Sequence, residues 1–289
     1  MKIFKKNHSF ALIIIVFTLI TYTFVDNQRI KIAKQEVVIG HLPKELNGFT
    51  ILQISDLHEK EFGKDQVRLI KKINTLSYDA IVFTGDMLKN SESTNYKPFY
   101  DLLDGIDNKE TALFVPGNTD PESYDNFNHK TDFVVGIEQR GVKLLESNYR
   151  VEKNTGKVIF VSFENALEGS SESKDVLIGL THYPVVDAKI DFIFSKPNHI
   201  VRDLDLLMAG HYHGGQIRLP LFGAIFIPEG SYPMDGLFPP QDRVKGLWEY
   251  RKIKQYVSTG LGSSDAIPLL DFRYFNTPEI NLLILRGPK

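Results

Sequence analysis

The sequence contains no cysteine among its 289 residues. This absence excludes a disulfide framework, a zinc site built on thiolates and a cysteine nucleophile. Any bound metal must therefore be held by carboxylate, amide or imidazole side chains, which suit manganese, iron or zinc.

An excess of charge of either sign is also missing, because 34 Lys and Arg stand against 36 Asp and Glu. Without a strongly basic balance, the chain has no sign of a nucleic-acid-binding surface, and we expect no specific binding of nucleic acid. The chain also lacks internal repeats and low-complexity tracts. Its 42% apolar and 24% charged residues are ordinary for a globular protein, and its length suffices for one large domain or two small ones.

Only one long hydrophobic run is present, and it lies near the N-terminus. A head that contains Lys2, Lys5 and Lys6 precedes an apolar run from Phe10 to Val25. This order is typical of a secretory signal or a signal anchor. The run is slightly shorter than the roughly 17–25 residues usual for a membrane span, but flanking lysines can extend it by snorkelling.

The end of this run favours an anchor over a cleaved signal. No small-x-small cleavage site follows it, and Tyr22 and Phe24 are aromatic residues of the kind found at membrane interfaces. We therefore interpret residues 1–27 as a single-pass anchor in the cell membrane. Residues 28–289 are then one domain on the extracytoplasmic side, with the lysine-rich head inside.

Five short apolar runs each end in residues of a type that binds metals. These are 51–55 before Asp56 and His58, 80–84 before Asp86, 112–116 before Asn118, 176–180 before His182, and 204–208 before His211 and His213. Sites in open α/β sheets are built at the carboxyl ends of strands. In an extended or tightly turned segment, the two histidines of the His-x-His pair point the same way, and the flanking glycines allow a close backbone approach.

The spacing of these runs predicts an α/β fold. About thirty residues separate the first three motifs, which is the size of a βαβ unit. Apolar residues at helical spacing within 64–76 and 99–106 supply the helices between the strands. Because such crossovers are right-handed, the strands should lie parallel with their polar ends on one edge. Later segments predict a helix over 133–140, a hairpin over 149–163 and strands over 255–258 and 280–285.

Taken in order, the motifs resemble the calcineurin-like metallophosphoesterase superfamily. The family pattern is Asp-x-His, Gly-Asp, Gly-Asn-His-Asp/Glu, a lone His, and Gly-His-x-His. The chain matches at Asp56-x-His58, Gly85-Asp86, Gly117-Asn118, His182 and Gly210-His211-x-His213, but Thr119 stands where the family has histidine. The segments 214–220, 256–262 and 278–280 are similar to the membrane-anchored bacterial phosphodiesterase branch of this superfamily.

The resemblance implies a four-layer α/β/β/α sandwich of two mixed sheets, preceded here by the hydrophobic anchor helix. It also implies two divalent metal ions, with manganese expected first and iron or zinc as alternatives. The implied ligands are Asp56, His58 and His213 for one ion, Asn118, His182 and His211 for the other, and Asp86 as the bridge. Of these we regard Asp86, Asn118 and His211 as the catalytic residues.

The implied activity is hydrolysis of phosphate esters, most directly of phosphodiesters, by a hydroxide that bridges the two ions. The expected substrates are cell-wall or lipid-linked phosphates. We expect Thr119 and Arg218 to contact the substrate, although Arg218 could equally be an ordinary strand residue; His129 and His199 are weaker candidates. Two alternatives stay open: a pyrophosphatase acting on nucleotide-diphospho-lipids, and a metal-binding surface protein that has lost its catalytic capacity.

Overall fold

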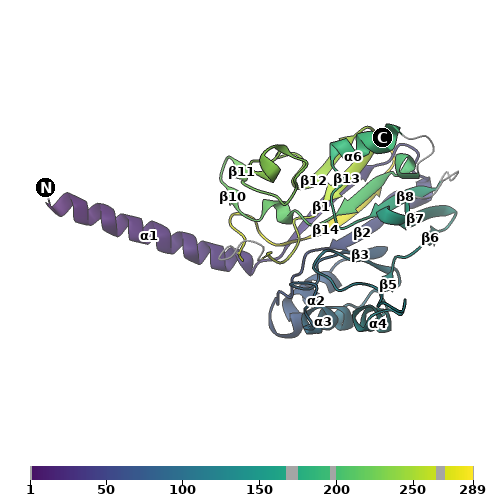
Figure 1. The fold of residues 1–289 in the computed structure, drawn as a ribbon, viewed down its shortest axis with the longest axis horizontal. Coiled ribbons are helices and arrows are strands. Elements are labelled where there is room, and N and C mark those ends of the chain that lie inside the picture. The colour runs from purple at the N-terminus through teal and green to yellow at the C-terminus, as the bar shows by residue number, and fades with distance from the viewer. Residues whose placement is uncertain (1, 167–174, 196–199, 265–270, 289) are drawn as a thin grey trace.

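The computed structural model describes residues 2–166, 175–195, 200–264 and 271–288, which form a long N-terminal helix followed by two β-sheets and the helices beside them. The helix α1 (Lys2–Asn27) projects from the domain as a rod (Figure 1). Within the described ranges it is the one helix that is long and apolar enough to cross a membrane. The qualifying stretch is Phe10–Asn27, of which 6% is buried.

The first sheet has six strands and carries the first three sequence motifs. Its order is β1 (Lys31–Val38), β14 (Glu279–Arg286), β2 (Thr50–Ile54), β3 (Ala80–Thr84), β4 (Ala112–Val115) and β5 (Lys143–Leu144). Strands β2 to β5 run parallel, as the βαβ spacing predicts. Strand β14 is antiparallel to β2 and parallel to β1, so the sheet is mixed.

The second sheet also has six strands and carries the histidine motifs. Its order is β12 (Gly246–Tyr250), β13 (Ile253–Val257), β9 (Leu206–Ala209), β8 (Val176–Leu180), β7 (Gly156–Ser162) and β6 (Tyr149–Lys153). The pairs β12–β13 and β6–β7 are antiparallel and the central pairs are parallel. A separate two-stranded ribbon, β10 (Arg218–Leu219) and β11 (Gly223–Ala224), follows the last histidine motif.

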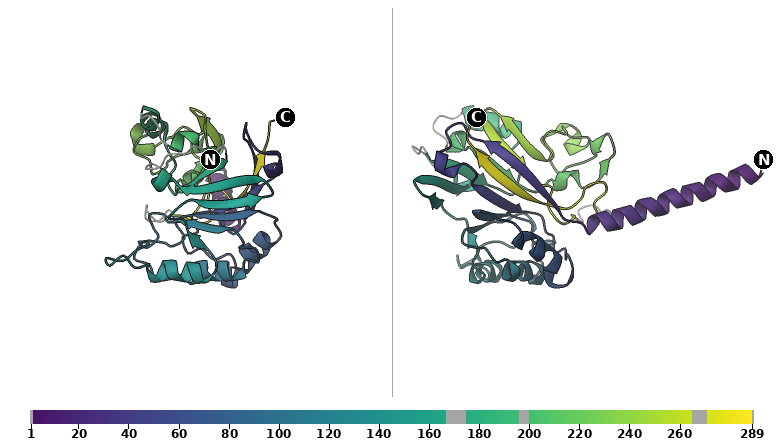
Figure 2. Two further views of the ribbon diagram at one scale, coloured as in Figure 1. Left: turned by 90° about the vertical axis from the view of Figure 1, so that its right-hand side faces the viewer. Right: turned by 180° about the vertical axis from the view of Figure 1, so that it is seen from behind.

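Helices cover the outer face of each sheet, which gives four layers (Figures 1 and 2). Against the first sheet lie α2 (Val67–Asn74), α3 (Lys97–Gly105) and α4 (Asp132–Gln139), and against the second lie α5 (Phe163–Ala166) and α6 (Asp187–Ser195). On β3, Ile81 and Phe83 pack toward the helices, whereas Val82 packs toward Ile178 and Met208 of the other sheet. The strands are buried on both faces, which explains their unbroken apolar runs. The expected α/β/β/α sandwich is confirmed.

A buried amide joins the two sheets just below the polar strand ends. The Nε2 atom of Gln53 on β2 donates to Thr84 Oγ1 on β3 and to the Ala209 carbonyl on β9, each at 2.9 Å. Because unpaired buried polar groups are costly, these bonds fix the sheets relative to one another at this level. The strand ends above Gln53 are therefore held in a defined position.

Candidate metal centre

Loops at the carboxyl ends of strands from both sheets carry the residues that the sequence singles out. Asp56 and His58 follow β2, Asp86 follows β3, Asn118 follows β4, His182 follows β8, and His211 and His213 follow β9. Within each sheet these strands are parallel, so their carboxyl ends lie along one edge. The packing of the two sheets brings the two edges together.

A first group of possible ligands consists of Asp56, His58, Asp86 and His213, whose ligand-type atoms all lie within 4.8 Å of one another. The Nε2 atoms of His58 and His213 are 3.2 Å apart, and His213 Nε2 is 3.7 Å from Asp56 Oδ1. All four residues are buried. Two ring nitrogens can face each other in this way only with a proton or a cation between them.

A second group consists of Asp86, His182 and His211, to which Asn118 adds an amide oxygen. His182 Nε2 lies 3.1 Å from His211 Nδ1 and 3.2 Å from Asn118 Oδ1. His182 Nδ1 lies 2.9 Å from the Thr84 carbonyl oxygen, to which it donates its proton. This bond directs the Nε2 lone pair into the group, as the second hydrogen bond of a metal-binding histidine does.

One carboxylate oxygen of Asp86 connects the two groups. Its Oδ2 atom lies 3.5 Å from His58 Nε2 and 3.3 Å from His182 Nε2. The other oxygen, Oδ1, accepts a hydrogen bond from the backbone N–H of Thr119 at 2.9 Å. The geometry therefore leaves Oδ2 as the atom that faces both groups, while Oδ1 orients the side chain.

The donor chemistry of both groups fits divalent cations. Asp56 and Asp86 are 0% and 2% exposed, and within the described part of the chain neither forms an ion pair with lysine or arginine. Asp56 Oδ2 is buried without a hydrogen-bond partner in the described residues. Buried carboxylates need a compensating cation, and the neighbouring imidazoles and amide are ordinary ligands for one.

Burial shifts the protonation of these groups. Desolvation, opposed by the charge of His182, raises the pKa of Asp56 to about 7. Desolvation and the charge of His182 lower the pKa of His211 to about 4. Desolvation lowers the pKa of His182, but the negative charge of Asp86 and its hydrogen bond outweigh this effect and raise the pKa to about 9. Metal ions would replace protons in this cluster, so metal affinity should rise with pH.

The raised pKa of Asp56 has a measurable consequence for stability. With metal removed by a chelator, we expect Asp56→Asn to be more stable than the wild type at pH 8. The folded-state pKa is about 7 against an ordinary 3.8, so the metal-free wild type loses stability as the pH rises through this interval, by about 1.4 kcal/mol per pH unit. Asp56→Asn has no ionisable group at this position and does not lose stability in this way, so the difference in stability between the two proteins should vanish toward pH 4.

Urea unfolding at several pH values measures the difference. Saturating manganese should make the wild type more stable than Asp56→Asn at pH 8, because the bound cation then compensates the charge of the Asp56 carboxylate. Equal stabilities of the two metal-free proteins at pH 8 would contradict a destabilising charge at this position.

The backbone at these strand ends is strained. A left-handed conformation is adopted by Asp56 (φ 53°), His58 (φ 47°), Asp86 (φ 58°), His211 (φ 68°) and His213 (φ 49°). This region is uncommon for residues other than glycine, and Asp and His are among those that tolerate it. Such strain persists where the surroundings over-determine the conformation, typically at functional sites.

Glycines make room for the Asp56 carboxylate. A β-carbon at Gly210 would overlap Ser55 Oγ and would lie 2.6 Å from Asp56 Oδ2. A β-carbon at Gly260, whose φ is 72°, would lie 2.6 Å from Asp56 Cβ. The glycine before His211 is therefore required by the close approach of β9 to Asp56.

Asp120 and Thr119 serve the loop around Asp86. The carboxylate of Asp120 accepts hydrogen bonds from the backbone N–H groups of Asp86, Met87 and Gly117, each at 2.8 Å. The Thr119 hydroxyl donates to the Leu88 carbonyl at 2.7 Å. The Thr119 hydroxyl proton is therefore already used in a hydrogen bond within the protein. Thr119 nevertheless lines a cavity beside the candidate metal ligands of the two groups, which we call the metal-type residues. Its contact with substrate stays a prediction.

Arg218 and His129, two further predicted substrate contacts, have partners within the protein. The Arg218 guanidinium donates to the Gly214 carbonyl at 2.7 Å, and Arg218 lines neither of the two described cavities. His129 is exposed and lies 3.4 Å from the Asp125 carboxylate on a surface loop. His199 lies outside the described residues. Phosphate binding by Arg218 remains a prediction.

Arg273 is a structural residue of the site that sequence reasoning missed. It is 0% exposed and donates to the carbonyls of His213, Thr259, Gly262 and Asn276 at 2.6–2.9 Å. Its own backbone N–H donates to Asn27 Oδ1 at the end of α1 (2.9 Å), and Asn27 Nδ2 donates to its carbonyl (2.6 Å). No motif marks this arginine, because its partners are backbone carbonyls spread along the chain.

A cavity of about 460 Å³ opens beside the two groups. Asp86, Asn118, Thr119 and His211 form its polar wall, and Ile225, Phe226, Pro228 and Leu237 lie on its apolar wall. A phosphate ester bound at the metal-type residues would occupy this space. Asn118 and His211 both line this cavity, and their catalytic roles remain predictions.

Comparisons with known proteins agree with this geometry. The sequence model of the calcineurin-like phosphoesterase family matches residues 49–215. The uncharacterized metallophosphoesterase YkuE of Bacillus subtilis is 25% identical over 280 residues, covering 91% of this chain and 88% of YkuE. The phosphodiesterase YaeI of Escherichia coli is 26% identical over 252 residues, covering 82% of each chain.

A further relative carries a more specific name. The UDP-2,3-diacylglucosamine pyrophosphatase LpxG of Chlamydia muridarum is 24% identical over 318 residues, covering 93% of this chain and 94% of LpxG. The family model spans the strands β2, β3, β4, β8 and β9 and the loops that follow them. The chain therefore belongs to the calcineurin-like phosphoesterase family, and its clustered Asp and His residues could hold divalent metal ions.

Proposed function

We propose that the chain is a phosphodiesterase that uses two divalent metal ions, with manganese as the expected metal. The observation that carries this proposal is the position of Asp86 Oδ2, which lies within 3.5 Å of a ring nitrogen from each group. One oxygen facing two sets of ligands is the arrangement that a bridging carboxylate requires. The membership of the family supports hydrolysis of a phosphate ester.

Each residue has a defined task in this proposal. Bound divalent ions would supply Lewis acidity and an activated water for attack on phosphorus. Asp56, His58 and His213 would hold one ion, and Asn118, His182 and His211 would hold the other. Asp120 fixes the loop that presents Asp86, through its backbone hydrogen bonds. Arg273 fixes the His213 loop through the His213 carbonyl.

Metal analysis and a substrate screen test the proposal together. The purified full chain should bind two equivalents of manganese and hydrolyse bis(4-nitrophenyl) phosphate faster than 4-nitrophenyl phosphate. A chelator should abolish the activity and added manganese should restore it. Stoichiometric metal binding without hydrolysis of any monoester, diester or pyrophosphate would instead identify a metal-binding surface protein.

A pyrophosphatase acting on nucleotide-diphospho-lipids is the second candidate. The pyrophosphatase LpxG, which matches nearly the whole chain, favours it. Thr119 also favours it, because a phosphate leaving group departs without the proton that a histidine at this position would supply. A pyrophosphate ester hydrolysed faster than the diester in the same screen would select this activity.

The N-terminal helix supports a membrane location for this enzyme. We propose that residues 1–27 anchor the chain and that residues 28–289 form the hydrolase domain outside the cytoplasm. The stretch Phe10–Asn27 is exposed and apolar, and the lysine-rich head before it favours the cytoplasmic side. Contacts of Asp26 with Thr277 (2.7 Å) and of Asn27 with Arg273 attach the end of the helix to the domain.

The proposed membrane topology can be tested by cell fractionation and by protease treatment of spheroplasts. The full-length protein should sediment with membranes, and protease added to spheroplasts should degrade the domain while a cytoplasmic marker stays intact. A version that begins at Val25 should be soluble and should hydrolyse bis(4-nitrophenyl) phosphate, which has no alkyl chain, because it keeps the contacts of Asp26 and Asn27. Protection of the domain from the protease would reverse the proposed orientation.

A further inference from the structure

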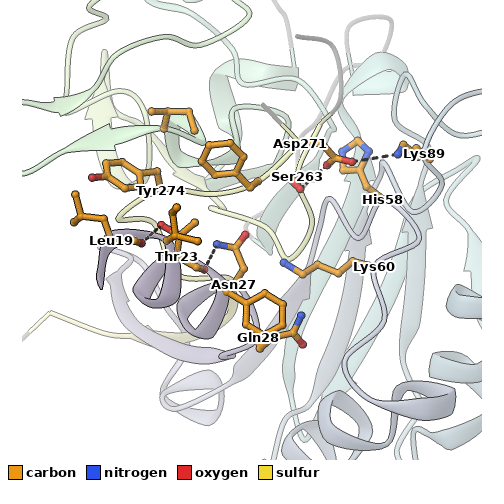
Figure 3. A pocket seen from close by; sticks show the side chains of 14 residues that line it. Leu19, Thr23, Asn27, Gln28, His58, Lys60, Lys89, Ser263, Asp271 and Tyr274 are labelled. Atoms are coloured by element: carbon orange, nitrogen blue, oxygen red, sulfur yellow. Dashed lines mark hydrogen bonds and ion pairs between the residues drawn. The ribbon is translucent and has the colours of Figure 1, made fainter. Parts of the chain in front are cut away.

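A second cavity, of about 800 Å³, lies between α1 and the domain (Figure 3). We call it the anchor pocket. Its wall on the helix includes Leu19, Ile20 and Phe24, and its wall on the domain includes Ile217, Phe272 and Tyr274. The proposed chemistry at the strand ends leaves this apolar space unused.

The helix wall of the anchor pocket belongs to the stretch that can cross a membrane. Leu19, Ile20 and Phe24 all fall within Phe10–Asn27. At 1.5 Å per residue, Leu19 lies about 12 Å along the helix from Asn27, which is within one leaflet of a hydrocarbon core about 30 Å thick. The apolar end of the pocket would therefore open into lipid.

The opposite end of the anchor pocket is polar and reaches the metal-type residues. His58, Lys60 and Lys89 line it, and Figure 3 shows Lys60 extending toward the helix from the side of the domain that carries His58. Lys89 is paired with Asp271 at 3.2 Å. An apolar end in lipid and a polar end that contains His58 and the hydrogen-bond donor Lys60 complement an apolar chain joined to a phosphate.

Exposed apolar side chains on the ribbon β10–β11 are consistent with a domain that rests on the bilayer. Leu221 and Phe222, in the turn between these strands, are 104% and 77% exposed. The ribbon lies on the side of the domain from which α1 projects (Figures 1 and 2). Apolar residues so exposed are typical of an interaction surface, and the ribbon that carries them lies on the same side of the molecule as α1.

We propose that the anchor pocket binds the hydrocarbon chain of a membrane-resident phosphate ester whose phosphate lies at the metal-type residues. This inference rests on the proposed phosphodiesterase function and assigns it a substrate class. The chain stays beside α1 while the head group occupies the cavity next to Asn118 and His211. The anchor helix is then part of the substrate site as well as a membrane attachment.

A series of alkyl 4-nitrophenyl phosphates tests this inference with the full-length, manganese-loaded protein in detergent. Water adds its oxygen to phosphorus, the bond to 4-nitrophenolate breaks, and the alkyl phosphate remains. Each buried methylene contributes about 0.8 kcal/mol, roughly fourfold. We therefore expect kcat/KM for the decyl ester to exceed that for the ethyl ester by at least about tenfold, with each ester kept below its micelle-forming concentration.

Two phenylalanines on the same face of α1 provide a matched pair of variants. Phe24 lines the anchor pocket, whereas Phe17, seven residues earlier, does not; they are 71% and 69% exposed. Phe24→Ala should lower the decyl-to-ethyl ratio of kcat/KM about threefold to tenfold. Phe17→Ala should keep the wild-type ratio, and metal content should show that both variants are folded.

The outcomes separate the two proposals. No hydrolysis of either ester in manganese would overturn the phosphodiesterase itself. Hydrolysis of both esters at equal kcat/KM would leave the phosphodiesterase standing and overturn the chain-binding pocket. An equal loss of the ratio in both phenylalanine variants would also overturn the pocket, because it would show that the chain effect comes from general contact with the helix.

Discussion

Replacement of Asp86 by asparagine is expected to reduce hydrolysis by about a hundredfold to a few thousandfold. Asp86 Oδ2 faces both groups of ligands, and a neutral amide in its place leaves the charge of each ion less well compensated. Loss of one partner from a buried charged contact costs about 3–5 kcal/mol, and every 1.4 kcal/mol is a factor of ten in rate. Metal content should fall together with the activity, from two equivalents to one or fewer.

An exposed aspartate provides the matched control for this substitution. Asp125 lies on a surface loop beside His129, and Asp125→Asn should keep both metal equivalents and the full rate. Metal analysis by mass spectrometry and the rate with bis(4-nitrophenyl) phosphate give the two readings. An Asp86→Asn protein with two metals and normal turnover would show that the assignment of the bridge is wrong.

Replacement of Thr119 by histidine is expected to raise the rate on esters with basic alkoxide leaving groups by about a hundredfold. General-acid assistance is worth about 10²–10⁴-fold, and a threonine hydroxyl cannot supply it near neutral pH. In this protein the hydroxyl proton is moreover donated to the Leu88 carbonyl. We expect the lower end of the range, because Asp120 is already bonded to backbone N–H groups and cannot orient the new histidine without losing them.

The dependence of rate on leaving-group pKa measures this effect. The wild type should show a steep fall in log rate as the leaving group becomes more basic, and hence a preference for phenolates or pyrophosphate bonds. The slope should flatten in Thr119→His and stay steep in Thr119→Ser, which keeps the hydroxyl. Shallow, equal slopes in all three proteins would show that another group donates the proton.

Most of the central fold could be predicted from local patterns. The buried strands β2, β3 and β4 are continuous apolar runs that end at a polar residue, and the helices between them follow from apolar residues at helical spacing. The position of β14 could not be predicted in this way. It is the last strand in the chain, yet it lies antiparallel between β1 and β2, and only packing against strands from the other end of the chain decides that.

The site shows the same division. The motifs predict which side chains gather, because residues that follow parallel strands must lie along one sheet edge. They do not predict the hydrogen bonds of Thr119 and Asp120, since these depend on how the loops after β3 and β4 fold against each other. They also give no sign of the role of Arg273, whose acceptors are backbone carbonyls.

By itself, the sequence determined the family, the strand ends and the types of ligand, because each depends on a few neighbouring residues and on their order along the chain. Tertiary structure alone decided that Asp86 presents a single oxygen to both groups of ligands. It also decided that the end of α1 bonds Arg273 across 246 positions of the chain and that a pocket lies between helix and domain. These features arise from contacts between distant segments, which form only when hydrophobic burial packs the sheets and the helix end together.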